Sequence, residues 1–214
     1  MIKNNILNIK NTLYSEEFKK IRTNLKYTST KSNRTILITS SEAGEGKSTI
    51  AINLTSSLAE DNKKVVLVDC DLRRPSLHKY LKISNSSGVS DILVGKKSLL
   101  SCIRKVNDNF SIITAGYKSL NPMELLDTEE MDNLIKELKN KFDYVIIDSP
   151  PITVVSDAQI LASKVDGIIV VVKAEQTKKD KLNLCRKLIT NVNGNIIGGI
   201  LNDVATKAKF YEYY

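Results

Sequence analysis

The stretch ILITSSEAGEGKST, residues 36–49, decides the fold of this 214-residue chain. An apolar, β-branched run comes first, a loop with Gly44 and Gly46 follows, and a segment of helical character continues after it. Glycines let a backbone curl so that its N–H groups converge on an anion at the N-terminus of the next helix. The stretch therefore predicts a strand, a phosphate-binding loop and a helix in that order.

The side chains of this loop are those of a nucleoside triphosphate site. Lys47 is placed to reach the β and γ phosphates, Ser48 to offer its hydroxyl to Mg²⁺, and Thr49 to assist with a phosphate oxygen. Ser41 stands where the strict G-x-x-x-x-G-K-[ST] pattern has its first glycine, but the strand before and the helix after support the site. The predicted nucleotide-binding residues of the loop are Gly44, Glu45, Gly46, Lys47, Ser48 and Thr49.

Short apolar runs alternate with amphipathic stretches along the rest of the chain. Predicted strands span residues 35–40, 65–70, 111–116, 144–149, 167–173 and 196–202, and predicted helices span 47–60, 131–142, 156–164 and 178–191. Because most of the strands are apolar throughout, they are expected to be buried on both faces of a mainly parallel sheet. The fold class is thus an α/β, three-layer α/β/α sandwich of the P-loop NTPase type. Residues 75–110 are the least regular part, where we expect insertions and flexible surface loops.

Acidic residues follow two of the predicted strands. Asp69 and Asp71 end the run VVLVDCD, and Asp148 ends the run YVIID. Ligands of open parallel sheets bind outside the carboxyl ends of the strands, so these acids should meet the phosphate loop in one crevice. Each Asp taken alone could equally be a helix or turn cap. Together with Ser48, the three acids predict a Mg²⁺ site.

The composition excludes several other classes of protein. No run approaches the ~20 apolar residues of a membrane span, and the N-terminus lacks the apolar core of a secretory signal, so we expect a cytoplasmic protein. Cys70, Cys102 and Cys185 are widely spaced, and the single histidine, His78, excludes a histidine-clustered metal site. Of the net charge of +8, most lies in the first 34 residues, which hold eight Lys or Arg and two Glu. Such an arm could meet a membrane, an acidic partner or nucleic acid, or could be a solvated helix face.

With these residues in view, the chain resembles the bacterial tyrosine kinases that regulate capsule and exopolysaccharide synthesis, in the form where the kinase is a separate cytoplasmic polypeptide. The segments that carry this resemblance are the loop 41–49, VVLVDCDLRRP (65–75), VIIDSPP (145–151), EEFKKIRTNL (16–25) and the tail FYEYY (210–214). The resemblance implies ATP and Mg²⁺ as cofactors, with Lys47 on the phosphates. It also implies Ser48 and Asp148 around the metal, and Asp69 and Asp71 around the metal and the incoming tyrosine. Asp69 is the expected catalytic base, with Asp71 as the alternative.

The resemblance extends to residues outside the crevice. Asn202 corresponds to a position that approaches the adenine in related ATPases, although a turn-forming asparagine is an equal alternative. Glu16, Lys19 and Arg22 correspond to the family's Glu-x-x-Arg-x-x-Arg motif of ring-like self-assembly. Because lysine cannot form a planar, two-pronged pair with a carboxylate, Lys19 weakens the expectation of a ring.

The tail holds the expected substrate. Tyr211, Tyr213 and Tyr214 are three of the chain's eight tyrosines, and the resemblance implies that they are phosphorylated by a neighbouring subunit. A simpler interpretation is that these aromatic residues only dock on the domain surface. The resemblance also implies a transmembrane activator that holds the kinase at the inner face of the plasma membrane, with no specific nucleic acid. The expected division is a basic helical arm (1–33), a kinase domain (34–204) and a flexible tail (205–214).

Two other functions remain open at this point. One is a partitioning or division-site ATPase of the deviant Walker group, which has this fold but transfers no phosphoryl group to protein. Those proteins carry a signature lysine where this chain has Glu42, and a glutamate cannot reach a partner's phosphates as a cation would. The other is a nucleotide-binding regulatory module without kinase activity.

Overall fold

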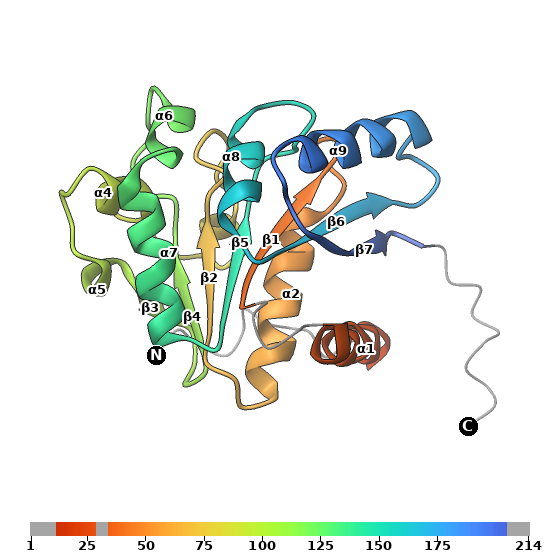
Figure 1. The fold of residues 1–214 in the computed structure, drawn as a ribbon. Helices are drawn as coiled ribbons and strands as arrows, with labels where there is room; N and C mark the ends of the chain where they lie inside the picture. Colours follow the sequence, from red (N-terminus) through yellow and green to blue (C-terminus); the bar gives the residue numbers. More distant parts are fainter. Residues whose placement is uncertain (1–11, 29–33, 205–214) are drawn as a thin grey trace.

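The computed structural model describes residues 12–28 and 34–204, which are built around one seven-stranded sheet (Figure 1). The strand order is β3-β4-β2-β5-β1-β6-β7, and neighbours run parallel except β3 and β4, which are antiparallel. The strands are β1 (Thr35–Ser40), β2 (Val65–Asp69), β3 (Arg104–Lys105), β4 (Phe110–Ile113), β5 (Tyr144–Asp148), β6 (Gly167–Lys173) and β7 (Ile196–Asn202). This arrangement confirms the predicted mainly parallel central sheet.

Helices cover both faces of the sheet, as predicted for a three-layer sandwich (Figure 1). They are α1 (Thr12–Thr28), α2 (Lys47–Glu60), α3 (Leu77–Tyr80), α4 (Val89–Leu93), α5 (Leu99–Cys102), α6 (Pro122–Leu126), α7 (Glu129–Lys141), α8 (Asp157–Lys164) and α9 (Lys179–Asn191). One apolar cluster includes residues of α1, α2 and α3, and the other includes residues of α7, α8 and α9. Within the described ranges, no helix has the length and apolar character needed to cross a bilayer.

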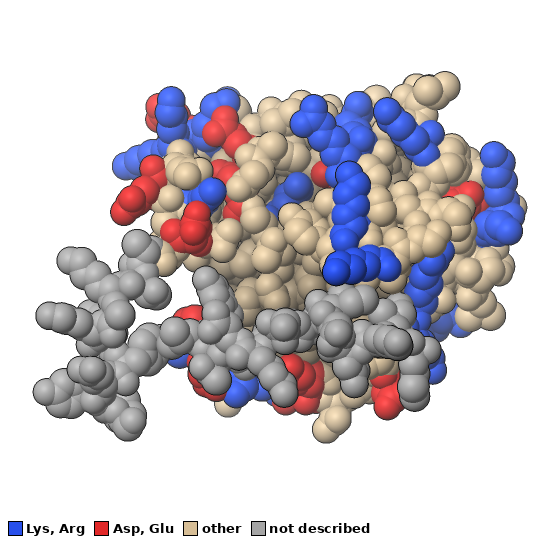
Figure 2. Space-filling model, turned by 180° about the vertical axis from the view of Figure 1, so that it is seen from behind, with Lys and Arg blue, Asp and Glu red and all other residues tan. Residues whose placement is uncertain are grey.

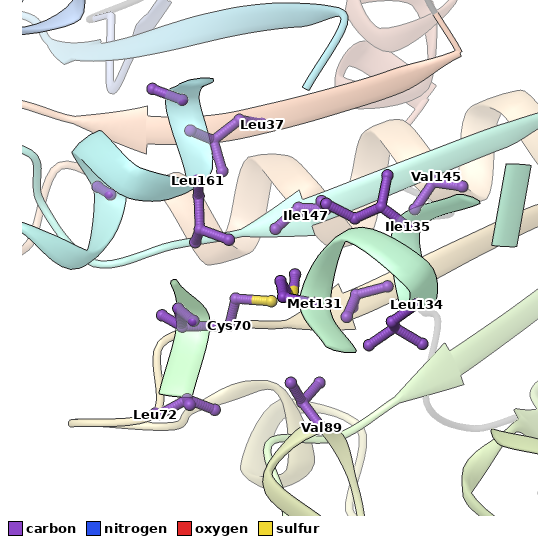
Figure 3. Packing of buried hydrophobic residues seen from close by; sticks show 14 of the residues in the cluster. Leu37, Cys70, Leu72, Val89, Met131, Leu134, Ile135, Val145, Ile147 and Leu161 are labelled. Atoms are coloured by element: carbon purple, nitrogen blue, oxygen red, sulfur yellow. The ribbon is translucent and has the colours of Figure 1, made fainter. Parts of the chain in front are cut away.

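The buried strands show why the apolar runs do not alternate with polar residues. In β1, Leu37 joins the cluster under α7 and α8, whereas Ile36 and Ile38 join the cluster under α2. All three side chains are fully buried, because successive residues of a strand point to opposite faces and both faces are covered. Figure 3 shows Leu37 and Ile147 from neighbouring strands together with Met131 from α7 in the first of these clusters.

The N-terminal helix belongs to this packing. Phe18 and Leu25 of α1 are buried in the cluster that also contains residues of α2. Arg22 donates a hydrogen bond from Nη1 to the Ser57 carbonyl of α2 (2.6 Å), and Lys26 forms an ion pair with Asp61. Helix α1 is therefore fixed to α2 by both apolar and polar contacts.

The expectation for residues 75–110 was correct in that loops join only short elements there, but wrong in that the segment is not confined to the surface. The segment forms α3, α4, α5 and the edge strand β3, and its side chains contribute to both cores. Leu77, Val89 and Cys102 are fully buried. Its helices have only four or five residues, which is too short to show helical periodicity in the sequence.

A carboxylate on the loop before β6 connects that loop to the start of β1. Asp166 accepts hydrogen bonds from the backbone N–H groups of Arg34 (3.0 Å) and Thr35 (2.8 Å) and from Lys139 Nζ (2.8 Å). Burial alone would raise the pKa of Asp166, but the hydrogen bonds from Lys139, Thr35 and Arg34 outweigh it and hold the pKa below its ordinary value. The ionised carboxylate is thus stabilised in the folded state.

We expect Asp166→Asn to lower the free energy of unfolding by about 1–2 kcal/mol at pH 7. A lowered folded-state pKa contributes stability above the unfolded pKa, and this contribution disappears as the pH falls through the folded value. Urea unfolding at pH 7 and near pH 3 should therefore show a difference between parent and variant that shrinks in acid. An equal difference at both pH values would contradict this account of the ion pair.

Candidate active site

Three adjacent strands bring the predicted site residues to one edge of the sheet. The order β2-β5-β1 places the loops that follow these strands side by side at their carboxyl ends (Figure 1). Asp69 of β2 and Asp148 of β5 are directly paired in the parallel register, and Ile38 of β1 pairs with Asp148 from the other side. The predicted convergence of the acids on the phosphate loop is therefore what the fold produces.

The phosphate loop depends on two glycines with positive φ. Gly44 has φ 82° and Gly46 has φ 92°, a region that other residues rarely adopt. At Gly46 a Cβ atom would lie 2.1 Å from Nδ2 of Asn202, so only glycine fits there. The Asn202 amide in turn donates from Nδ2 to the carbonyl of Glu45 (3.0 Å). Asn202, at the end of β7, thus lies against the loop.

Lys47, the first residue of α2, points to the acids rather than to solvent. Its Nζ lies 3.6 Å from Oδ2 of Asp71, and the two side chains are only 13% and 7% exposed. Oδ1 of Asp71 accepts a hydrogen bond from the backbone N–H of Arg74 (3.0 Å), which fixes the carboxylate towards Lys47. The Lys47 ammonium group is thereby held between the phosphate loop and the residues that follow β2.

Asp148 has the features of a metal ligand. The side chain is fully buried, and neither carboxylate oxygen has a hydrogen-bond partner within the described part of the chain. Burial raises its pKa to about 6, although the Lys47 charge and the Ser48 hydroxyl work in the opposite direction. A buried carboxylate with two free oxygens beside a serine hydroxyl suits Mg²⁺, which prefers oxygen ligands.

The acids alone do not form a complete metal cage. Within the described residues, no group of three or more His, Cys, Asp or Glu side chains is arranged to hold a metal ion. Mg²⁺ is commonly bound by one or two carboxylates together with waters and substrate phosphates. The residues present, Ser48 and Asp148 with Asp71 and Asp69 nearby, fit this kind of shared site.

Asp69 is as fully buried as Asp148, but its carboxylate has backbone partners. Its oxygens accept hydrogen bonds from the backbone N–H groups of Asp71 and Leu77, both at 3.3 Å, and its side chain is fully buried. Burial first, and then the charges of Asp148 and Asp71, raise the pKa of Asp69 well above its ordinary value. A carboxylate with a raised pKa is a stronger base than an exposed one.

The side chain of Glu45 is buried in the loop and stabilises it, which the sequence pattern did not predict. Glu45 is 4% exposed, and its carboxylate accepts hydrogen bonds from Ser41 Oγ (2.9 and 3.1 Å), the Glu42 N–H (3.0 Å) and Thr177 Oγ1. These contacts connect the loop to the turn between β6 and α9. They also explain why a serine stands at position 41, because a glycine there would leave Glu45 without that donor.

A second missed contact joins the segments after β2 and β5. Arg73 donates from Nε and Nη2 to the two carboxylate oxygens of Asp157 (2.8 and 2.9 Å), and Asp157 is fully buried. Hydrogen bonding to Asp157 raises the pKa of Arg73. The pair holds the turn that carries Asp71 against the first residue of α8.

We expect Arg73→Ala to destabilise the protein by about 1–3 kcal/mol, because it leaves a buried carboxylate without its cation. Arg73→Lys should recover only part of the loss, since lysine offers no two-pronged geometry. The matched control is Arg74→Ala, an exposed neighbour expected to stay within about 0.5 kcal/mol of the parent. Urea unfolding of the three variants measures this, and equal losses at both arginines would contradict the role of the pair.

The predicted residues of α1 lie away from this crevice. Glu16 and Lys19 of α1 pair with each other (2.6 Å), and Arg22 contacts the C-terminal half of α2, whereas the phosphate loop precedes its N-terminus. Thr49 is exposed in the first turn of α2. Tyr211, Tyr213 and Tyr214 lie outside the described residues.

Comparison with known proteins shows what this site is related to. The family described as AAA domain matches residues 33–197. The chain is 35% identical over 206 residues to the tyrosine-protein kinase YwqD of Bacillus subtilis, covering 95% of this chain and 87% of that protein. It is 34% identical over 201 residues to the tyrosine-protein kinase CpsD of Streptococcus agalactiae, covering 93% and 87%.

Comparison with solved structures leads to the same family. The kinase domain of the Escherichia coli tyrosine kinase ETK superimposes with a TM-score of 0.90 at 30% identity, covering 98% of this chain and 84% of that one. The septum site-determining protein MinD from Pyrococcus horikoshii, complexed with Mg-ADP, is less similar, with a TM-score of 0.67 at 27% identity over 78% of this chain and 69% of that one. Because its relatives named as tyrosine-protein kinases are similar along almost the whole sequence, the chain belongs to the family of bacterial tyrosine kinases.

Proposed function

We propose that the protein is an ATP- and Mg²⁺-dependent autokinase that phosphorylates its own tail tyrosines and thereby regulates capsular or exopolysaccharide synthesis. The observation that carries the proposal is the buried, unpartnered Asp148 carboxylate beside Lys47 and Ser48. Such a carboxylate is costly in the free protein and becomes useful when a cation and phosphates occupy the crevice. The relatives named as tyrosine-protein kinases support the choice of tyrosine as acceptor.

Each residue of the crevice has a role in this reaction. The loop N–H groups and Lys47 bind the phosphates and neutralise charge as the phosphoryl group moves. Ser48 and Asp148, with Asp69 and Asp71 nearby, would hold Mg²⁺, which supplies further charge neutralisation when bound. Asn202, whose amide donates to the Glu45 carbonyl of the loop, would contact the adenine of the nucleotide.

The chemical step needs a base because a tyrosine hydroxyl, with a pKa near 10, is a poor nucleophile at neutral pH. The phenolic oxygen forms a bond to the γ phosphorus, the bond from that phosphorus to the β–γ bridging oxygen breaks, and ADP leaves. Asp69 accepts the phenolic proton, with Asp71 as the alternative base.

The acceptors are Tyr211, Tyr213 and Tyr214. From Asn202 to Tyr214 the chain has 12 residues, about 40 Å if extended, so the tail can reach a crevice on its own or a neighbouring subunit. We propose transfer between subunits of a ring that uses Glu16, Lys19 and Arg22. Each phosphate adds roughly −1.5 to −2 charges, and the resulting repulsion would separate the subunits.

The proposed setting is the inner face of the plasma membrane. A transmembrane activator of polysaccharide export would hold the kinase there and activate it. In this division of the chain, residues 1–33 supply the basic segment that faces the membrane, 34–204 the kinase domain and 205–214 the substrate tail.

One contact weighs against the division-site type of ATPase. Glu42, at the position of the signature lysine of that group, lies with Oε1 3.2 Å from Nζ of Lys181 on α9. The acidic side chain thus pairs within its own chain, and at that position it offers no cation for a partner's nucleotide.

Incubation of the purified chain with Mg-ATP, followed by phosphosite mapping by mass spectrometry, tests the proposal. We expect phosphotyrosine at the three tail positions, and none when Mg²⁺ is chelated. ATP hydrolysis with unmodified tyrosines would favour the ATPase, and neither hydrolysis nor modification, with the activator's cytoplasmic segment present, would favour a regulatory module.

A further inference from the structure

Positive charge is concentrated between residues 73 and 105. Apart from Arg73, which holds the turn that carries Asp71, this segment has no part in the proposed reaction. Between Arg73 and Lys105 the chain has eight Lys or Arg and a single acid, Asp91. Asp91 is buried and accepts a hydrogen bond from the Gly88 N–H (3.0 Å), so it does not neutralise the surface. In Figure 2 the side of the molecule that carries β3 shows mainly Lys and Arg, whereas the opposite side shows both signs of charge.

The compact part of this segment is the end of α4, the turn after it, α5 and β3. Residues 94–98 are five consecutive exposed residues, and Leu99 and Cys102 are buried under α5. We call the exposed and partly exposed side chains of this region the α4–β3 patch, which consists of Val94, Lys96, Lys97, Leu100, Arg104 and Lys105.

The four cations of the patch are not neutralised by the protein. Among the described residues, none of them lies within ion-pair distance of a carboxylate. Arg104 donates one long hydrogen bond to Ser87 Oγ (3.5 Å), and Lys96 Nζ lies 5.0 Å from the centre of the Tyr117 ring. Most of their hydrogen-bonding capacity therefore remains for an external anion.

Two aliphatic side chains are exposed among these cations. Leu100 is 71% exposed and Val94 is 41% exposed, because the neighbouring Leu99 and Leu93 take the buried positions. A cationic surface with projecting aliphatic side chains combines the two attractions of peripheral membrane binding, which are charge towards anionic headgroups and burial of apolar groups at the acyl boundary.

We infer that the α4–β3 patch binds the anionic surface of a lipid bilayer directly. A nucleic acid is the other polyanion to consider, but surfaces that bind single strands use exposed aromatic rings for base stacking. The exposed apolar residues of the patch are aliphatic, and Tyr117, a ring 37% exposed beside the patch, is faced by Lys96 Nζ at 5.0 Å. The surface thus fits headgroups and acyl chains better than bases.

Vesicle sedimentation of the full chain tests the inference. We expect binding to phosphatidylcholine vesicles containing about 30% phosphatidylserine, little binding to pure phosphatidylcholine, and loss of binding in high salt. The variant with Lys96, Lys97, Arg104 and Lys105 changed to Gln should bind at least about 10²-fold more weakly, since each cation near an anionic surface contributes about fivefold. Binding that remains at moderate salt depends on the apolar contacts, so Leu100→Ser should weaken it.

The matched control removes the same charge from α9. Changing Lys178, Lys179, Arg186 and Lys187, all exposed, to Gln should alter vesicle binding by less than about threefold if the patch is specific. Equal losses in the two variants would overturn the inference in favour of unspecific attraction by net charge. Absence of vesicle binding by the parent, or competition by a single-stranded oligonucleotide that binds the patch more tightly, would also overturn it.

Discussion

Lys47→Met is expected to reduce phosphorylation of the tail by about 10²–10³-fold while the protein remains folded. Lys47 is the cation held between the phosphate loop and Asp71, and its Nζ is 3.6 Å from Oδ2 of that residue. In the nucleotide complex this charge would move to the phosphates, where negative charge builds up as the γ-phosphoryl group transfers. Methionine keeps a similar length of side chain but provides neither the charge nor a donor.

The measurement is the initial rate of tail phosphotyrosine formation with saturating Mg-ATP, together with the dissociation constant of ADP. Lys187→Met, an exposed substitution on α9, serves as the control and should retain the parental rate. A Lys47→Met protein with the parental rate and a normal melting curve would exclude the proposed role of this lysine.

Asp148→Asn should have opposite effects on stability and on activity. Asp148 is fully buried and has no hydrogen-bond partner among the described residues, and burial raises its pKa from 3.8 to about 6. A raised pKa means that the ionised carboxylate costs stability, and about two pKa units correspond to roughly 3 kcal/mol. Asparagine keeps the shape without the charge, so it should raise the free energy of unfolding above pH 6 by up to about 3 kcal/mol.

The difference in the free energy of unfolding between the parent and Asp148→Asn should depend on pH. Below about pH 3 the carboxyl group is largely protonated in both the folded and the unfolded state, so the parent and Asp148→Asn should be about equally stable. The difference should grow as the pH rises from about 4 to 6, where the unfolded carboxyl ionises before the folded one, and stay constant above that range. Urea unfolding in EDTA measures these values.

The same variant should lose the stabilisation by Mg-ADP and nearly all kinase activity, since Asp148 would bind the metal in the complex. An Asp148→Asn protein that is less stable than the parent at pH 8 in EDTA, or that is still stabilised by Mg-ADP as the parent is, would contradict this assignment.

Several parts of the fold could be predicted from sequence because local signals were strong. The runs 35–40, 167–173 and 196–202 have the bounds of β1, β6 and β7, since each is an apolar run with clear ends. The two-residue strand β3, Arg104–Lys105, was missed because two basic residues show no strand pattern. Its antiparallel pairing depends on the fold around it.

The sequence predicts the site residues that end strands. It does not predict the contacts between residues that are far apart in the chain. Asp69 and Asp148 were expected to meet because both end strands of a parallel sheet, whose carboxyl ends share one edge, although the sequence did not predict that β2 and β5 are neighbours. The Arg73–Asp157 pair joins residues 84 positions apart, and the burial of Glu45 depends on Thr177, 132 positions away. No local pattern marks such contacts, because the packing of the finished domain creates them.

The central claim is that the crevice and the tyrosine tail are enzyme and substrate of one reaction, and one measurement tests it most directly. The variant with Tyr211, Tyr213 and Tyr214 all changed to Phe is incubated with labelled ATP and Mg²⁺, and incorporation into protein is compared with the parent. The substitutions remove only three hydroxyl groups, leaving five other tyrosines of the eight in the chain. We predict incorporation as low as in Lys47→Met; incorporation equal to that of the parent would contradict the account.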